Sequence, residues 1–319
     1  MPRWAMSCAR KSTRSRCARS RRKSGIARNT ATDPCPPIRR GAARIVDRLP
    51  LRRRRVSIAR VSYRSDLVSV RGVQTHIRQA GRGQPVLVLH PEFAADLWSP
   101  YHDQLAAHFR LVVPDHLGFG RSERPEWLDR VDDLVFHYLD LLDLMNLDRV
   151  SVVGTSLGGW IAAAFAIAHP ERVERLVLAA PAGIKVDGVP RYDLFANPIE
   201  QTLRHLFHDE TRAAQLIPSE YGPSVLLRAY HEYTTLARLA WDPYLYDPKL
   251  QQRLPRVTNP TLIVWGENDA VLPPEYGRRF AALLPGARLA MVPRCGHLVP
   301  LEQSEAFSHL AIEFLAAGR

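Results

Sequence analysis

The hydrophobic pattern over most of the chain alternates between short, fully apolar runs and longer segments with helical spacing. Runs such as "PVLVLH" (85–90) and "RVSVVG" (149–154) lack polar–apolar alternation, which is typical of strands buried on both faces of a parallel sheet. Segments such as "VDDLVFHYLDLLDLM" (131–145) and "LGGWIAAAFAIAHP" (157–170) place apolar residues at helical intervals. This order predicts an α/β fold with a doubly wound, mostly parallel sheet, to which the hairpin "LVSVRGVQTHIRQAG" (67–81) adds an antiparallel edge.

The alternation of strands and helices stops between residues 184 and 254, where only helical patterns follow one another. We interpret this segment as a helical cap inserted between two strands, so that residues 65–183 and 255–319 together form the core domain. The inserted segment contains nine aromatic residues, and those that do not pack against the core predict a mainly apolar pocket. A small molecule is therefore the expected partner.

The basic charge of the chain is concentrated in residues 1–64, which hold 20 of the 44 Lys and Arg residues but only two of the 32 acidic residues. The rest of the chain has a formal charge of −6, so the overall charge of +12 does not indicate a folded nucleic-acid-binding surface. With few apolar residues and no periodicity, residues 1–64 predict a disordered tail without a specific nucleic-acid partner. An electrostatic arm for nucleic acid or anionic membranes, and a targeting segment, stay open as alternatives.

The cysteines and the apolar stretches bear on localisation. Three of the four cysteines lie in the basic tail and none forms a C-x-x-C pair, so neither a disulfide framework nor a zinc site is expected. The longest apolar stretch, about nine residues from Trp160 to Ala168, is shorter than the roughly 18 residues that a membrane span needs. We expect a cytoplasmic protein without a membrane span.

Ser156 stands in "GTSLG" (154–158), where a predicted strand turns at once into a predicted helix. So sharp a turn forces the serine into an unfavourable backbone conformation and needs glycine on either side, because a Cβ there would collide with the neighbouring strand or helix. The hydroxyl then stands above the sheet at a helix N-terminus, where the helix dipole and the N–H of Leu157 favour negative charge. The context favours a nucleophilic serine over a glycine-rich turn that carries a serine by chance.

A serine nucleophile needs a base, and the base needs a carboxylate that orients it. Asp269 follows the predicted strand "TLIVWG", and His297 follows the predicted strand "ARLAMVP". Because parallel strands gather their carboxyl ends at one edge of a sheet, Ser156, Asp269 and His297 are expected to meet there.

Other residues offer alternatives for these roles. Asp187 lies shortly after a strand and is an alternative acid, while His90 and His116 also end strands and are alternative bases. His297 is favoured because it alone follows a glycine in a loop after a strand. His205 and His208 share a predicted helix, which is weak evidence for a metal, so we expect no metal and no organic cofactor.

Four motifs of the chain resemble, in order, those of the α/β-hydrolase superfamily: "VPDHLGFGRS", "VVGTSLGG", "WGENDAVLP" and "GHLVPLEQ". The resemblance covers residues 66–319 and is to the capped branch that includes esterases, carbon–carbon bond hydrolases and cofactor-free haloperoxidases. It implies an α/β-hydrolase fold and a catalytic triad of Ser156, Asp269 and His297. Dehalogenases and epoxide hydrolases of this branch carry aspartate at the nucleophile position, so Ser156 disfavours both chemistries.

The segment "LHPEFAADLW" departs from the family pattern, which usually has His-Gly after the first parallel strand, because Pro91 replaces the glycine. By position, the backbone N–H of Glu92 is expected to join that of Leu157 in the oxyanion hole. Pro91 has a fixed φ and no N–H, but it leaves the N–H of Glu92 available. Since a carboxylate beside an oxyanion would oppose it, we expect the Glu92 side chain to point away or to meet a cation.

The resemblance implies that His297 takes the proton of Ser156 as the serine oxygen attacks an acyl carbon, and that water then releases the acyl group. We expect a hydrolase of small, mainly apolar carboxylic esters. One alternative is a carbon–carbon bond hydrolase of ring-cleavage products, for which Arg191, Arg204 and Arg228 are candidates to bind the substrate's acid end. The other alternative is a non-catalytic, ligand-binding member of the same fold.

Overall fold

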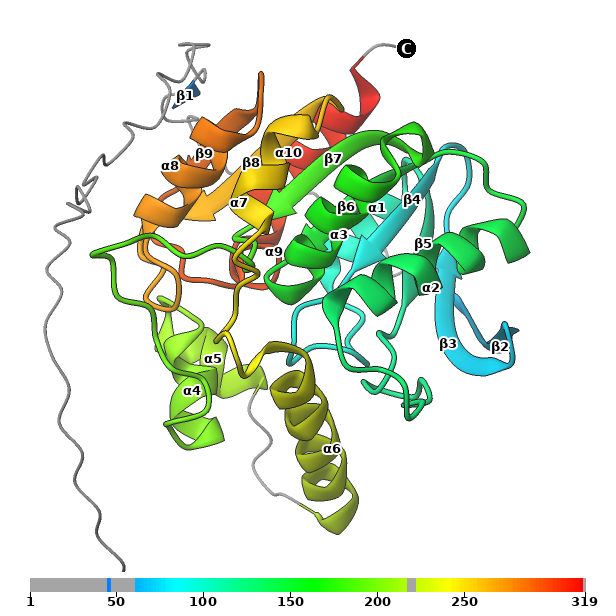
Figure 1. Ribbon diagram of the computed structural model, residues 1–319, viewed down its shortest axis with the longest axis horizontal. Helices are drawn as coiled ribbons and strands as arrows, with labels where there is room; N and C mark the ends of the chain where they lie inside the picture. The colour runs from blue at the N-terminus through cyan, green and yellow to red at the C-terminus, as the bar shows by residue number, and fades with distance from the viewer. Residues whose placement is uncertain (1–44, 47–60, 217–221, 318–319) are drawn as a thin grey trace, which may run out of the picture. The chain divides into compact units, whose positions relative to one another are not determined.

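The computed structural model describes residues 45–46, 61–216 and 222–317, which contain one mixed sheet with helices on both faces (Figure 1). The strands are β1 (Ile45–Val46), β2 (Arg64–Val70), β3 (Val73–Ala80), β4 (Pro85–Leu89), β5 (Arg110–Pro114), β6 (Val150–Thr155), β7 (Val173–Ala179), β8 (Thr261–Gly266) and β9 (Arg288–Val292). Their order across the sheet is β1-β9-β8-β7-β6-β4-β5-β3-β2. All neighbours from β1 to β5 pair in parallel, whereas β3 runs antiparallel to both β5 and β2. The predicted doubly wound, mostly parallel sheet is confirmed.

The helices follow the predicted alternation with the core strands. They are α1 (Pro100–Ala106), α2 (Val131–Leu144), α3 (Leu157–Ala168), α4 (Ile199–His205), α5 (Glu210–Leu216), α6 (Pro223–Ala240), α7 (Leu250–Arg253), α8 (Pro274–Leu283), α9 (Val299–Glu302) and α10 (Ser304–Ala316). Apolar side chains of α2, α3 and α8 belong to one core cluster, and those of α1 and α10 belong to a second cluster. The sheet lies between these two helical layers.

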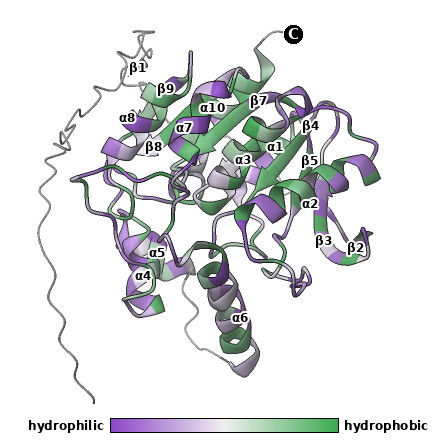
Figure 2. Cartoon of the chain, viewed as in Figure 1, coloured by the Kyte–Doolittle hydropathy of each residue, from purple (hydrophilic) through white to green (hydrophobic). Residues whose placement is uncertain are grey.

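The central strands are largely apolar because each contributes to both clusters. In β4, Leu87 and Leu89 pack into the first cluster, while Val86 and Val88 pack into the second. Each such side chain contributes about 1.5–3 kcal/mol when it is fully buried, so a polar residue on either face would be costly. Figure 2 shows the same property in β7, which is coloured as hydrophobic over much of its length.

Only helices and loops are found between β7 and β8 in the described residues, and α4, α5 and α6 group at one end of the sheet (Figure 1). Several contacts connect this segment to the core, and three of them involve different core loops. Arg228 pairs with Asp96 after β4 at 2.9 Å, and the Thr235 hydroxyl donates to the Gly118 carbonyl after β5 at 3.0 Å. The N–H of His297, after β9, donates to a carbonyl of the helical segment at 2.9 Å. The segment therefore rests on the loops at the carboxyl ends of the strands.

The predicted disordered tail, residues 1–64, lies outside the described residues except for residues 45–46 and 61–64. At two of these positions the chain is a strand instead, because Ile45 and Val46 pair in parallel with Leu289 and Ala290 of β9. Among the described residues, no helix combines the length and the apolar character that a membrane crossing requires.

Candidate active site

Ser156 occupies the turn between β6 and α3, in a backbone conformation that side chains rarely adopt, with φ of 49° and ψ of −114°. A Cβ added to Gly154 would lie 2.3 Å from the Gly158 carbonyl oxygen, and one added to Gly158 would lie 2.3 Å from that of Leu89. Backbone atoms cannot turn away from such a clash as a flexible side chain can. Both flanking glycines are therefore required, as the sequence predicts.

The structure brings together the three residues predicted to form the triad. The Ser156 Oγ lies 2.8 Å from His297 Nε2, and His297 Nδ1 lies 2.8 Å from the Asp269 carboxylate. The other carboxylate oxygen of Asp269 accepts from the N–H groups of Val271 and Leu272, both at 2.9 Å, which fixes its orientation. A carboxylate at Nδ1 holds the proton of a neutral imidazole on that nitrogen, so Nε2 is free to accept the serine proton.

The alternative acid and bases lie elsewhere. The Asp187 side chain is 97% exposed and pairs with Lys185 at 3.9 Å, so it does not reach His297. His90 and His116 stack on each other, with ring centroids 3.7 Å apart, and neither bonds to Ser156.

The surroundings of His297 favour its protonated form. Burial by itself lowers the pKa of this imidazole, but the charge and the hydrogen bond of Asp269 raise it, and the charge of Glu92 raises it further. The pKa of His297 is therefore raised above its ordinary value of 6.5. Because of this raised pKa the imidazole is a stronger base, and a higher pH is needed to keep it neutral.

The Glu92 side chain contradicts the expectation that it points away or meets a cation. Its Oε1 lies 3.2 Å from the Ser156 Oγ, so it competes with His297 Nε2 for the single hydroxyl proton, and its Oε2 accepts from the N–H of Leu157 at 3.4 Å. The expectation considered repulsion by an oxyanion, which exists only during turnover. In the resting site, the positive end of the α3 dipole attracts the carboxylate instead. The carboxylate therefore lies beside one of the two predicted oxyanion donors.

The loop that carries Glu92 is held by a network that sequence reasoning missed. The backbone N–H of His116 donates to Nε2 of His90 at 2.9 Å, and Nε2 of His116 donates to the His90 carbonyl at 2.8 Å. The Tyr138 hydroxyl donates to Nδ1 of His116. His90 then carries its proton on Nδ1 and donates it to the Pro91 carbonyl at 2.6 Å. Burial lowers the pKa of His90 well below its ordinary value and that of His116 to about 4, so both rings stay neutral. The network fixes the peptide between Pro91 and Glu92.

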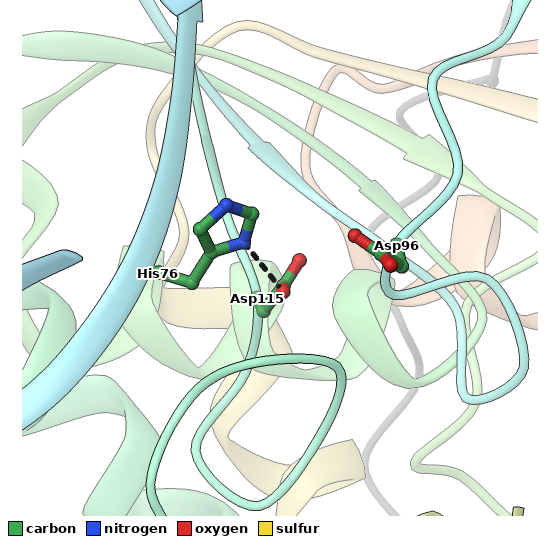
Figure 3. A group of neighbouring side chains, drawn as sticks. All are labelled: His76, Asp96 and Asp115. Atoms are coloured by element: carbon green, nitrogen blue, oxygen red, sulfur yellow. Dashed lines mark hydrogen bonds and ion pairs between the residues drawn. The ribbon is translucent and has the colours of Figure 1, made fainter. Parts of the chain in front are cut away.

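One group of three side chains in the described residues has the composition of a cation site: His76, Asp96 and Asp115 (Figure 3). His76 Nδ1 lies 2.7 Å from Asp115, and the Arg78 guanidinium bonds to the same carboxylate. Asp96 lies 2.9 Å from Arg228 of α6. Because guanidinium groups already neutralise both carboxylates, the group is an ion-pair network that joins the core to α6 rather than a metal centre.

Aromatic side chains of the helical segment contact one another. Phe195 lies at ring-centroid distances of 5.1 to 5.8 Å from the rings of Tyr233, Trp241 and Tyr244. His205, one of the two weak metal candidates, stacks on Tyr192 at 4.1 Å. Some of the aromatic side chains therefore pack against one another within the helical segment.

The three arginines considered for anion binding have different surroundings. Arg228 is ion-paired and Arg204 is exposed, whereas Arg191 lies over two tyrosine rings and has a buried guanidinium nitrogen without a hydrogen-bond partner. Burial raises the pKa of the Tyr244 hydroxyl; Glu92 raises it too, and Arg191 lowers it. Tyr244 therefore lies within electrostatic range of both Glu92 and Arg191, and the Arg191 guanidinium lies 5.0 Å from the Tyr244 ring centroid.

Residues 81–310 match the family model described as "Alpha/beta hydrolase family". The chain is 31% identical over 266 residues to a 2-hydroxy-6-oxo-2,4-heptadienoate hydrolase of Pseudomonas putida, over 79% of this chain and 96% of that protein. It is 30% identical over 271 residues to a 2-hydroxy-6-oxo-6-(2'-aminophenyl)hexa-2,4-dienoic acid hydrolase of Metapseudomonas resinovorans, over 80% and 92% of the two chains.

Solved structures show the same likeness. A serine hydrolase involved in carbazole degradation superposes with a TM-score of 0.66 at 28% identity, over 80% of this chain and 99% of that chain. A meta-cleavage product hydrolase from Pseudomonas fluorescens superposes with a TM-score of 0.66 at 25% identity, over 80% and 98% of the two chains.

Proposed function

Because the chain belongs to the α/β-hydrolase family and is a hydrolase of that fold, we propose that Ser156 is its nucleophile, His297 its general base and Asp269 the carboxylate that orients the base. The observation that carries this proposal is the continuous chain of hydrogen bonds from the Ser156 Oγ to Asp269. His297 takes the hydroxyl proton as Oγ attacks an acyl carbon, and Asp269 stabilises the imidazolium. Water, activated by the same imidazole, then releases the acyl group.

The N–H groups of Leu157 and Glu92 hold the oxyanion in this proposal. Leu157 opens α3, where the helix dipole favours negative charge. Among the hydrogen bonds of the described residues, none uses the N–H of Glu92, so this donor is available. The Glu92 carboxylate must leave the N–H of Leu157 before an oxyanion forms there.

For the bond that is cleaved, the relatives favour the carbon–carbon bond beside the ketone of a 2-hydroxy-6-oxo-dienoate, the class of compound in their names. The 2-hydroxyl proton of the dienol first moves to the carbon next to the ketone. Ser156 then adds to the ketone carbon, and collapse of the tetrahedral adduct releases the neighbouring carbon as a dienolate, which takes the proton from His297. Arg191 is the cation that we assign to the substrate's carboxylate, because its buried nitrogen lacks a partner. Residues 184–254 act as the cap that covers the substrate.

Hydrolysis of a small carboxylic ester, which the sequence alone placed first, is the second candidate. The same triad serves an ester, because both reactions pass through an acyl-serine.

Turnover of a ring-cleavage dienoate and of p-nitrophenyl esters from acetate to octanoate separates the two candidates. We expect dienoate turnover, and we expect Arg191→Gln to raise KM for the dienoate about 10- to 100-fold because a charge-assisted hydrogen bond is lost. The exposed Arg204→Gln is the matched control and should change neither parameter. Rapid ester hydrolysis without dienoate turnover would favour the ester, and no turnover of any compound would favour a ligand-binding protein.

A further inference from the structure

A second chain of hydrogen bonds joins a serine, a histidine and an aspartate outside the candidate active site. The Ser65 Oγ lies 2.8 Å from His76 Nε2, and His76 Nδ1 lies 2.7 Å from the Asp115 carboxylate (Figure 3). The corresponding distances in the chain that begins at Ser156 are both 2.8 Å. Apart from these two, no hydrogen bonds among the described residues join a hydroxyl through an imidazole to a carboxylate.

The antiparallel pairing of β2 with β3 places these side chains together. Ser65 of β2 lies opposite Arg78 of β3. Because His76 comes two residues before Arg78, its side chain shares one face of the pair with that of Ser65. Asp115 directly follows β5, which pairs with β3 on its other side. His76 therefore reaches Asp115 with one ring nitrogen and Ser65 with the other.

The members of this chain are oriented as a general base requires. The Asp115 carboxylate is buried, pairs with Arg78 and accepts from the N–H of Arg121 at 3.0 Å. It holds the proton of a neutral His76 imidazole on Nδ1, so that Nε2 faces the Ser65 hydroxyl as an acceptor. His76 is 1% exposed, whereas Ser65 is exposed. A reagent in solution therefore reaches the serine, while the base behind it stays shielded from water.

The Arg121 side chain supplies a cation beside Ser65. Its Nη1 lies 3.3 Å from His76 Nε2, the nitrogen that the Ser65 Oγ contacts more closely at 2.8 Å. None of the ion pairs among the described residues includes Arg121, whereas the nearby Asp96 is paired with Arg228. The exposed guanidinium is therefore available to an anion from solution.

Ser65 differs from Ser156 in its backbone, because it lies within β2 rather than at a helix N-terminus. The helix dipole that favours an oxyanion at Ser156 has no counterpart in a strand, so neutral acyl or phosphonyl reagents should react slowly with Ser65. A donor whose own anionic group pairs with Arg121 is instead held in place while Ser65 attacks. Leu67, two residues along the same face of β2 and 52% exposed, offers an apolar contact to such a donor.

We propose that Ser65 is a second nucleophilic serine, which takes the acyl group of a small aryl ester that carries a carboxylate. The Ser65 Oγ bonds to the acyl carbon as its proton passes to His76 Nε2. The bond from that carbon to the aryl oxygen then breaks, and the departing oxygen takes the proton from the imidazole. The products are O-acyl-Ser65 and a phenol, and Arg121 pairs with the carboxylate of the donor throughout.

The test uses the full chain with Ser156→Ala, so that its result does not depend on the proposed function. This protein is incubated at pH 8 with 3-acetoxybenzoate or with the uncharged methyl ester of that compound. Fragmentation mass spectrometry of the proteolysed chain then locates and quantifies the acetyl groups. Ser69 is the internal control, because it is exposed on the same face of β2 and makes no hydrogen bond to an imidazole among those of the described residues.

We expect acetylation of Ser65 to be about 10²- to 10⁴-fold faster than that of Ser69, which is the usual contribution of a general base. His76→Gln should remove most of this difference, with thermal unfolding to show that the variant is folded. At low ionic strength, 3-acetoxybenzoate should acetylate Ser65 about two- to fivefold faster than its methyl ester does. Arg121→Gln should abolish that preference, and Arg204→Gln, which removes another exposed arginine, should keep it.

Equal acetylation of Ser65 and Ser69 would overturn the inference, as would an unchanged rate at Ser65 in a folded His76→Gln variant. If that variant does not fold, the comparison of Ser65 with Ser69 decides alone. Equal rates at Ser65 for the two esters would overturn the assignment of an anionic donor to Arg121.

Discussion

Replacing Asp269 with asparagine keeps the shape of the side chain but changes what its two ends can do. In the wild type one oxygen accepts from the N–H groups of Val271 and Leu272, and the other accepts from His297 Nδ1. All three contacts require an acceptor, and an amide offers one oxygen and one NH2 group. The variant can therefore keep either the two N–H bonds from Val271 and Leu272 or the bond from His297 Nδ1, but not both.

The two orientations of the amide differ in cost. If its NH2 group faced Val271 and Leu272, two buried N–H donors would lose their acceptor, at about 1–3 kcal/mol each. The amide oxygen therefore keeps these bonds, and the NH2 group faces Nδ1 of His297. The imidazole must then carry its proton on Nε2, where it cannot accept the proton of Ser156. A wrong tautomer of this kind lowers kcat by about 10⁴-fold in serine triads.

The assay is kcat/KM for the best substrate of the ester and dienoate panel at pH 8, with thermal unfolding to show that each variant is folded. Asp187→Asn is the matched control, and it should change kcat/KM by less than about twofold because that side chain is 97% exposed. An Asp269→Asn variant within about tenfold of the wild type would refute the tautomer argument. A larger loss in Asp187→Asn than in Asp269→Asn would move the acid to the earlier strand.

Three further predictions concern pH, the turn and the tail. Burial lowers the pKa of His297, but Asp269 and Glu92 raise it by more, so the acid limb of the pH–rate profile should lie above pH 6.5. Activity is lost there as the imidazole gains its proton. Glu92→Gln should shift this limb to lower pH, and an unchanged midpoint would contradict the role given to Glu92. Gly158→Ala should destabilise the fold by about 1–3 kcal/mol in urea unfolding. Gly222→Ala, whose added Cβ meets nothing within 4 Å but which changes the N-cap of α6, should cost less than about 1 kcal/mol. Equal effects would speak against the close approach of Gly158 to Leu89. A chain that begins at Ser65 should keep its activity within about twofold, and a clear loss would show that residues before Ser65 contribute to the folded enzyme.

The core and the meeting of Ser156, Asp269 and His297 could be predicted because their signals are local. A strand buried on both faces must be apolar throughout, and a serine on a sharp turn must have glycine on either side, so both can be read from a few neighbouring residues. The carboxyl ends of parallel strands share one edge, which is why Asp269 and His297 could be placed beside Ser156 although they lie far along the chain.

The parts that could not be predicted depend on contacts between distant segments. The Glu92 carboxylate turns toward Leu157, where the α3 dipole attracts it. Its loop is held by a histidine pair that follows β4 and β5, and no pattern near Glu92 encodes that pairing. The β1 strand is two residues long and lies in an arginine-rich stretch without periodicity, so only its partner β9 reveals it. The role of Arg78 could not be predicted for the same reason, since its ion pair joins β3 to Asp115, the residue that follows β5.

Labelling with a fluorophosphonate, followed by mass spectrometry of the proteolysed chain, tests the central claim most directly. A serine hydroxyl reacts with this reagent rapidly only when an adjacent base activates it. We predict that the wild type is labelled on Ser156, that Ser156→Ala abolishes the labelling, and that the same variant lowers turnover about 10⁴-fold or more while it stays folded. Absence of label on Ser156 in an active wild-type enzyme, or full activity in Ser156→Ala, would contradict the claim that Ser156 is the nucleophile.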